Sequence, residues 1–347
     1  MMPQEWPIAA SADGRNGPAR LAGRSRLRTV RVDFFLEPAE RLTEQERAVM
    51  TAMLRCLVGD VASEIRAALP SGWAGANDDE AELVNRLARA GLLDDAGLIS
   101  LLLRRADEER IGIAARSRTG RGEARAIQGL VSHPNAEVSA AAMGVILARG
   151  RRRDRFGQCL LAFDDLLPES AETVVHAVAA ALRQQLAAAY GEAAADRELS
   201  RATSALIARQ DCARSVDSLT ASLVAALHEA GALTDELLLG SAREGEIAFL
   251  AEIIGRRAGI PGAVALVELL SGDAARLIAV LRLADLSRPL SAALLASLGD
   301  LIGIEDAGSA IQLFDVVTPE DLQAAASRLA APPRYRAALN LLGSLDD

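Results

Sequence analysis

A run of arginines is the strongest concentration of chemically active side chains in the sequence. Residues 149–155 are R-G-R-R-R-D-R. Guanidinium groups bind carboxylates and phosphates, so such a run can contact an acidic protein or a nucleic acid backbone. The alternative is a solvated loop between two helices. The candidate partner-contact residues are Arg149, Arg151, Arg152, Arg153 and Arg155.

The composition favours a protein partner over nucleic acid for this run. The chain of 347 residues has a net charge of −9 and only 3% aromatic residues, which fits neither tracking of a nucleic acid groove nor stacking on bases. The sequence also contains no lysine. Enzymes that need a Schiff-base, P-loop or kinase-type lysine are therefore excluded.

The remaining reactive side chains form no catalytic or metal-binding pattern. His176 lies on an Ala/Val-rich segment without a second ligand at helical spacing, so we interpret it as a core or boundary histidine. His133 precedes a proline and belongs to a turn, and His228 lacks basic neighbours that would support a phosphoryl relay. A G-x-S-x-G motif is absent. We predict no enzymatic activity, no cofactor and no metal.

Cysteines and paired acids have structural explanations. Cys56, Cys159 and Cys212 lack C-x-x-C spacing and are interpreted as small core residues of a reduced, cytoplasmic protein. Acids occur in pairs at residues 78–79, 94–95, 108–109, 164–165 and 346–347. Neighbouring side chains on a helix diverge by about 100°. We therefore interpret most of these pairs as caps at helix starts rather than as acid–base pairs.

The elements that position these residues are predicted to be helices. Thr43 and Glu46 have the spacing of a capping box, and the apolar residues that follow have helical spacing as far as Pro70. This pattern predicts one helix of about 25 residues, or two helices broken near Gly59. Short amphipathic helices follow, and residues 29–35 are the only strand candidate. The fold class is all-α.

Matching segments indicate that one helical unit occurs twice. Residues 90–99 (AGLLDDAGLI) match residues 230–239 (AGALTDELLL), and residues 130–138 match residues 269–277. A third match joins residues 163–168 to residues 284–289. We predict a HEAT-like stack of antiparallel helical pairs with two related halves. Two compact helical bundles in tandem are the alternative.

Four segments follow from these patterns. Residues 1–31 are predicted to be a disordered, Arg/Gly-rich tail and residues 32–77 an N-terminal helical segment. The first repeat half is placed at 78–215 and the second at 216–347. Uncharged stretches reach about 11 residues, fewer than the roughly 18–20 needed to cross a bilayer, so no membrane span is predicted.

Three segments resemble a known bacterial family. They are residues 32–55, residues 92–117 (LLDDAGLISLLLRRADEERIGIAARS) and residues 163–170 (FDDLLPES). They resemble the domain-of-unknown-function family numbered 2336 over most of the chain from about residue 32. The resemblance implies an all-helical, HEAT-like protein, and the family has no catalytic residues to transfer. The segment RTGRGEAR after Ser117 departs from the expected helix start.

The sequence therefore predicts a non-enzymatic helical-repeat protein that acts as an interaction scaffold or regulator. The first alternative is a nucleic-acid-associated protein that uses the arginine run. The second is a small-molecule sensor with an apolar cavity between helices, which requires a pocket of at least roughly 300 Å³.

Overall fold

A computed structural model describes residues 42–73, 80–120, 125–154, 157–332, 335–336 and 338–339. In these ranges the chain is helical and contains no β-strand; the only bridge outside strands that the structure gives joins Arg153 to Cys159. The all-α prediction is confirmed. None of the described helices is both long enough and apolar enough to cross a membrane. The predicted tail at 1–31 and the strand candidate at 29–35 lie outside the described residues.

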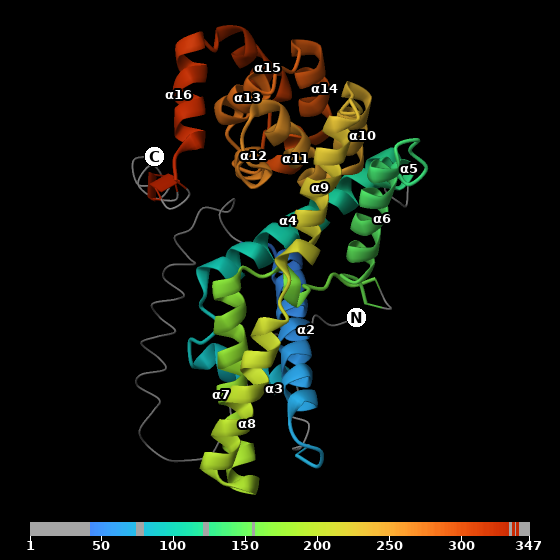
Figure 1. Cartoon of the computed structure of the whole chain (residues 1–347). Helices are drawn as coiled ribbons and strands as arrows, with labels where there is room; N and C mark the ends of the chain where they lie inside the picture. The colour runs from blue at the N-terminus through green and yellow to red at the C-terminus, as the bar shows by residue number, and fades with distance from the viewer. Residues whose placement is uncertain are drawn as a thin grey trace, which may run out of the picture. The chain divides into compact units, whose positions relative to one another are not determined.

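Figure 1 shows the described helices in the order in which they occur along the chain. Their bounds are α2 Glu44–Ala68, α3 Glu80–Arg89, α4 Ala96–Thr119, α5 Ala126–Leu130, α6 Ala136–Gly150, α7 Pro168–Tyr190, α8 Glu192–Ala208, α9 Val216–Glu229, α10 Asp235–Glu244, α11 Ile247–Ala258, α12 Gly262–Leu269, α13 Ala274–Leu283, α14 Arg288–Leu298, α15 Ala307–Val316 and α16 Pro319–Ala330, with 3-10 turns η2 Phe163–Asp165, η3 Cys212–Arg214 and η4 Gly299–Ile302.

The first described helix begins as its sequence predicts. The backbone N–H of Thr43 donates to Glu46 Oε2 at 2.7 Å, and the N–H of Glu46 donates to Thr43 Oγ1 at 3.2 Å. This reciprocal pair is a capping box. The helix continues for 25 residues through Gly59 without a break and ends before Pro70, so the single-helix prediction is correct.

The described residues from Ala48 onward belong to one compact unit that contains two hydrophobic cores. The smaller core is built by α2, α3, α7, α8 and the first half of α4. The larger core is built by the second half of α4 together with α5, α6 and α9–α16. α4 is thus the helix that belongs to both cores, and in Figure 1 it runs from one to the other.

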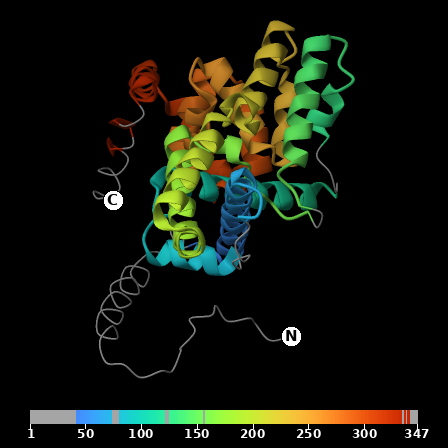
Figure 2. The ribbon, with the colours of Figure 1, turned by 60° about the horizontal axis from the view of Figure 1, so that its bottom comes forward.

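Helix neighbours in the larger core are not always consecutive in the chain. α6 packs against α9, and α10 packs against α14, so these pairs join helices that are distant in the sequence. α11 and α12, in contrast, are neighbours both in sequence and in space. α6 lies at the edge of this group of helices in Figure 2. Because α5 and α6 share a core with α9–α16, the two cores do not coincide with residues 78–215 and 216–347. The HEAT-like stack and its halves stay predictions.

The matched segments nevertheless share their local structure. Gly91 and Gly231 both end a helix with a positive φ, 69° and 65°. In each case the residue after the glycine donates its N–H to a carbonyl five residues earlier, at 3.1 and 2.8 Å, as in a Schellman motif. In the second matched pair, Asn135 and Asp273 both cap the following helix through their side chains, although Asp273 aligns with Pro134 and not with Asn135. The helix ends at Gly91 and Gly231 are therefore equivalent, whereas the caps of the second pair are one residue out of register.

Candidate functional site: the arginine run and the exposed face of α6

The charged middle of α4 separates the two cores. Arg105 is only 3% exposed, and it donates through its NH1 to Glu108 Oε2 at 2.7 Å and through its NH2 to Asp217 Oδ1 at 2.7 Å. Arg104 also pairs with Asp217, in the first turn of α9. These ion pairs tie α4 to α9 at the point where α4 passes from one core to the other.

Burial and charge act in opposite directions on these groups. Burial disfavours the charged form of Arg105, but Glu108 and Asp217 outweigh it and raise the pKa of Arg105 above its ordinary value. Burial would likewise raise the pKa of Asp217, yet Arg105 and Arg104 hold that pKa well below its ordinary value. Both groups therefore stay charged across the physiological range.

The arginine run contributes a buried ion pair to the same region. Arg152 donates through Nε and NH2 to the two carboxylate oxygens of Asp165, at 2.7 and 2.6 Å. Burial and the nearby Arg105 lower the pKa of Arg152 from its ordinary value. The Asp165 side chain is 1% exposed and accepts two further bonds, from the N–H groups of Ala162 and Val216, each at 3.2 Å. Arg152 therefore has a structural role.

The other residues of the run differ in their availability. Arg149 pairs with Glu246 at 2.6 Å, and Arg153 pairs with Glu109 at 2.8 Å. Arg151 is exposed and forms no ion pair with any residue that the structure describes. Arg155 lies outside the described residues. Within the described part of the run, Arg151 is thus the arginine whose guanidinium is open to a partner.

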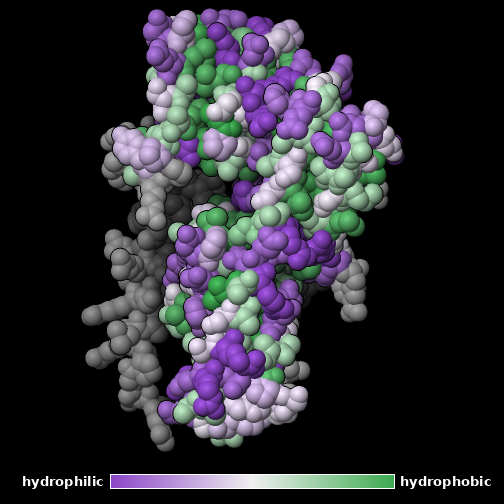
Figure 3. All heavy atoms as spheres, in the orientation of Figure 1, coloured by the Kyte–Doolittle hydropathy of each residue, from purple (hydrophilic) through white to green (hydrophobic). Residues whose placement is uncertain are grey.

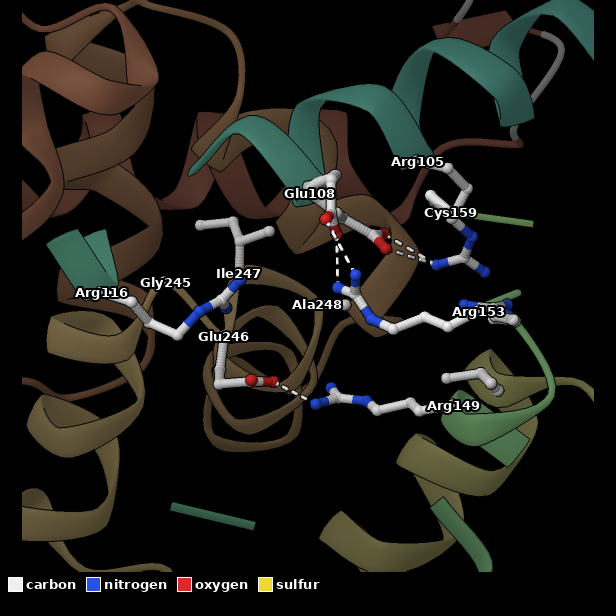
Figure 4. Close-up of a pocket in the computed structure, with 13 residues that line it drawn as sticks. Arg105, Glu108, Arg116, Arg149, Arg153, Cys159, Gly245, Glu246, Ile247 and Ala248 are labelled. Atoms are coloured by element: carbon white, nitrogen blue, oxygen red, sulfur yellow. Dashed lines mark hydrogen bonds and ion pairs between the residues drawn. The ribbon is translucent and has the colours of Figure 1, made fainter. Parts of the chain in front are cut away.

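These pairs line a polar cleft of about 130 Å³ (Figure 4). Arg105, Arg116, Arg149 and Arg153 reach it from α4 and from the arginine run, and Glu246 and Ile247 reach it from the start of α11. In Figure 4 the ion pair of Arg149 with Glu246 lies across the cleft. Because carboxylates of the chain already bind Arg105, Arg149 and Arg153, the cleft works as an internal electrostatic contact between α4, α6 and α11.

Two of the predicted environments are wrong. Cys212 is exposed and His176 is exposed on α7, so neither is a core residue. Cys56 and Cys159 are half-buried, and burial raises the pKa of Cys159. His133 lies in its predicted turn, where Nδ1 accepts the N–H of Asn135 at 3.2 Å. Among the described residues no group of His, Cys, Asp and Glu side chains could hold a metal ion.

The paired acids have three different outcomes. Asp95 caps α4 by accepting the N–H of Leu98 at 2.7 Å, as predicted. Asp165 accepts the N–H of Val216 and so serves the start of α9, which is distant in the sequence. The capping interpretation is wrong for Glu108 and Glu109, which lie inside α4 and bind arginines. The pairs at 78–79 and 346–347 lie outside the described residues.

An exposed apolar stripe on α6 was not predicted from the sequence. Met143 is 41% exposed and Leu147 is 58% exposed, one turn apart, and Ala136 and Ala140 continue the same exposed line toward the start of the helix. Figure 3 shows hydrophobic surface over α6 among hydrophilic regions. The opposite face, with Val138, Ala142 and Val145, is fully buried. A helix that is apolar on both faces was the available signal, because residues 138–148 carry no charge.

Comparison with known proteins places the chain in a bacterial family without assigning it a function. The model of a family described as an uncharacterised protein conserved in bacteria matches residues 85–327, more than half of the chain. This range includes α4, the arginine run and α6. No curated protein and no solved structure matches the chain. The sequence resemblance is confirmed, and the function must be argued from the residues.

Proposed function

The chain belongs to the bacterial domain-of-unknown-function family 2336, and we propose that it is a non-enzymatic interaction protein that binds protein through the exposed face of α6. We name this surface the α6 face and define it as Ala136, Ala140, Met143 and Leu147 together with the exposed charges Glu137 and Arg151. In this proposal the protein acts as a scaffold or a regulator. Its three cysteines are thiols that form no disulfide with one another, which fits a reducing cytoplasm.

The observation that supports the proposal is the pair of exposed large side chains on adjacent turns of one helix. A single exposed Leu or Met is ordinary, but an apolar line along a helix is the signature of a surface that another helix covers. The small residues Ala136 and Ala140 add to it, because they allow a partner helix to approach closely. Met143 adds a flexible side chain that adapts to the partner surface.

The two alternatives have less support. Binding of nucleic acid needs several arginines that can release counterions, whereas Arg149, Arg152 and Arg153 are bound to carboxylates of the chain. A sensor needs an apolar cavity. The apolar pocket in the larger core, lined by Leu250, Ile254 and other core residues, has a volume of about 10 Å³, far below the roughly 300 Å³ of a ligand pocket.

Site-specific photo-crosslinking in the native host tests the proposal. We replace Ala140 by p-benzoylphenylalanine, and as a matched control we replace Leu167, which is 61% exposed at the start of α7. We expect a discrete crosslinked protein with the residue on α6 and none with the control. Adducts that are absent from both positions, or identical at both, contradict the proposal. The mass of the adduct identifies the bound protein.

A further inference from the structure

We infer that the protein bound by the α6 face is a second copy of this chain, with the two α6 helices antiparallel about a two-fold axis. The inference rests on the proposed function and adds the identity of the partner. Two features of α6 support it, the spacing of its apolar residues and the placement of the exposed charges Glu137 and Arg151 near its ends, and its limited area predicts the strength of the contact.

The exposed residues have the spacing of a coiled-coil seam. Ala136, Ala140, Met143 and Leu147 are separated by four, three and four residues. That is the alternation of the d and a positions of a heptad, which lets a straight helix pack along the whole line. With Ala140 and Leu147 at a, and Ala136 and Met143 at d, the buried Val138 and Val145 fall at f, opposite the seam. One face of α6 thus packs into the larger core and the other fits a helical partner.

The two exposed charges specify the orientation of that partner. In this register Glu137 and Arg151 both fall at e positions, on the same side of the seam and seven residues on either side of Gly144. Arg151 is the C-cap residue of α6 and keeps helical backbone angles, with φ of −71° and ψ of −16°. Neither Glu137 nor Arg151 forms an ion pair with any other described residue. A two-fold axis beside Gly144 relates the two copies so that their helices run in opposite directions and their e positions lie on the same side of the seam. Glu137 of each copy then faces Arg151 of the other. Charges beside a seam set partner choice and orientation in this way.

An antiparallel pair of α6 helices therefore forms two Glu137–Arg151 ion pairs, one at each end. In a parallel pair an e residue faces a g residue of the other helix, and the g positions of α6 are Ser139 and Ile146, which carry no charge. The symmetric, isologous contact is also the commonest form of homodimer interface. The sequence of α6 is thus complementary to itself in the antiparallel orientation.

The area of the face predicts a weak dimer. α6 has 15 residues, so it is about 22 Å long, and two such helices in contact bury at most a few hundred Å² on each copy. A standard stable interface buries about 800 Å² on each partner. We expect a dissociation constant on the order of 10–100 µM, so that the dimer forms at high local concentration and separates on dilution.

Charge reversal in the full-length chain tests the pairing. Sedimentation equilibrium over about 5–500 µM is recorded for the wild type, for Glu137→Arg, for Arg151→Glu and for the double variant. Each single variant places like charges together at two points, and we expect roughly 10-fold weaker association for each. The double variant restores both pairs, and we expect association within about 3-fold of the wild type. An equimolar mixture of the two single variants should form a heterodimer.

A second pair of variants tests the apolar seam. Leu147→Asp should abolish dimerisation. The matched control Leu167→Asp changes an equally exposed leucine at a helix N-cap, where Asp is favourable, and should leave dimerisation unchanged. Far-UV circular dichroism of each variant must match the wild type. Glu137, Leu147, Arg151 and Leu167 are all exposed, so we expect each variant to fold.

A wild type that stays monomeric at about 500 µM overturns the inference. So does a double variant that is no better than the single variants, or a mixture without heterodimer. If the wild type is monomeric while the photo-crosslink at Ala140 captures a different protein, the proposed function stands and the self-pairing falls. If both measurements fail, both proposals fall.

Discussion

Replacing Asp165 by Asn tests whether the buried ion pair with Arg152 holds the connection between the two cores. The carboxylate of Asp165 accepts four hydrogen bonds, two from Arg152 and one each from the N–H groups of Ala162 and Val216. An asparagine side chain has one acceptor oxygen, and its amide group would face a donor. The substitution therefore removes the negative charge and leaves at least one buried donor without an acceptor.

The size of the effect follows from burial. The side chains of Asp165 and Arg152 are 1% and 10% exposed, so water cannot replace the lost charge. Breaking such a pair from one side costs about 3–5 kcal/mol, because the remaining charge is buried without compensation. We expect the free energy of unfolding to fall by that amount. Replacing both residues, Asp165→Leu with Arg152→Met, removes both buried charges but leaves the N–H groups of Ala162 and Val216 without an acceptor, so it should recover only part of the loss.

Urea unfolding followed by circular dichroism measures this difference. Asp315→Asn is the matched control, since Asp315 binds Arg288 through both oxygens at 3.0 and 3.1 Å but is 58% exposed. We expect that control to lose less than about 1 kcal/mol. A loss below about 1 kcal/mol in Asp165→Asn, or equal losses in the two variants, would refute the conclusion that burial makes the Arg152 pair structurally important.

Two further predictions concern stability. Gly245→Ala should cost about 2–4 kcal/mol in urea unfolding, because the new methyl group would lie 2.8 Å from the carbonyl oxygen of Ile111 and φ is 69°; Gly231→Ala, with φ of 65° and open space, should cost only about 1 kcal/mol. Equal losses of stability in the two variants would show that the end of α10 at Gly245 does not approach α4 closely. Burial and Asp217 raise the pKa of the half-buried Glu252 to about 6, so the folded state binds this proton more tightly than the unfolded state and gains stability as pH falls through 6. Glu252→Gln should therefore be more stable than the wild type by on the order of 1 kcal/mol at pH 7.5, with the difference vanishing near pH 4.5, and a pH-independent difference would contradict the pKa.

Local signals in the sequence were sufficient for the helices and their ends. The capping box of Thr43 and Glu46 and the cap at Asp95 depend on residues within one helical turn, and the structure contains both. The helix ends at Gly91 and Gly231, which the repeat matches to each other, also share one local hydrogen-bond pattern. Local hydrogen bonding and steric preference decide these features, so a short window of sequence contains the information.

The role of the arginine run could not be predicted because its partners are distant in the chain. Arg152 and Arg151 are neighbours in an apparently uniform basic run, yet Arg152 is buried on Asp165 and Arg151 is exposed. The difference depends on how the loop after α6 folds back toward α4 and α9. The capping interpretation of Glu109 was wrong for the same reason, since Glu109 pairs with Arg153. For Glu108 the signal was local, because Glu108 pairs with Arg105 and Arg104 at i,i+3 and i,i+4 spacing within α4.

Oxidative footprinting of Met143 is the most direct test of the claim that protein covers the α6 face. Hydroxyl radicals oxidise exposed methionines, and Met143 is 41% exposed whereas Met53 is fully buried and serves as an internal control. We predict that Met143 is oxidised several-fold more slowly in host cells, or at about 500 µM, than in the dilute isolated chain, while Met53 stays protected throughout. Equal oxidation of Met143 under all three conditions would contradict the account.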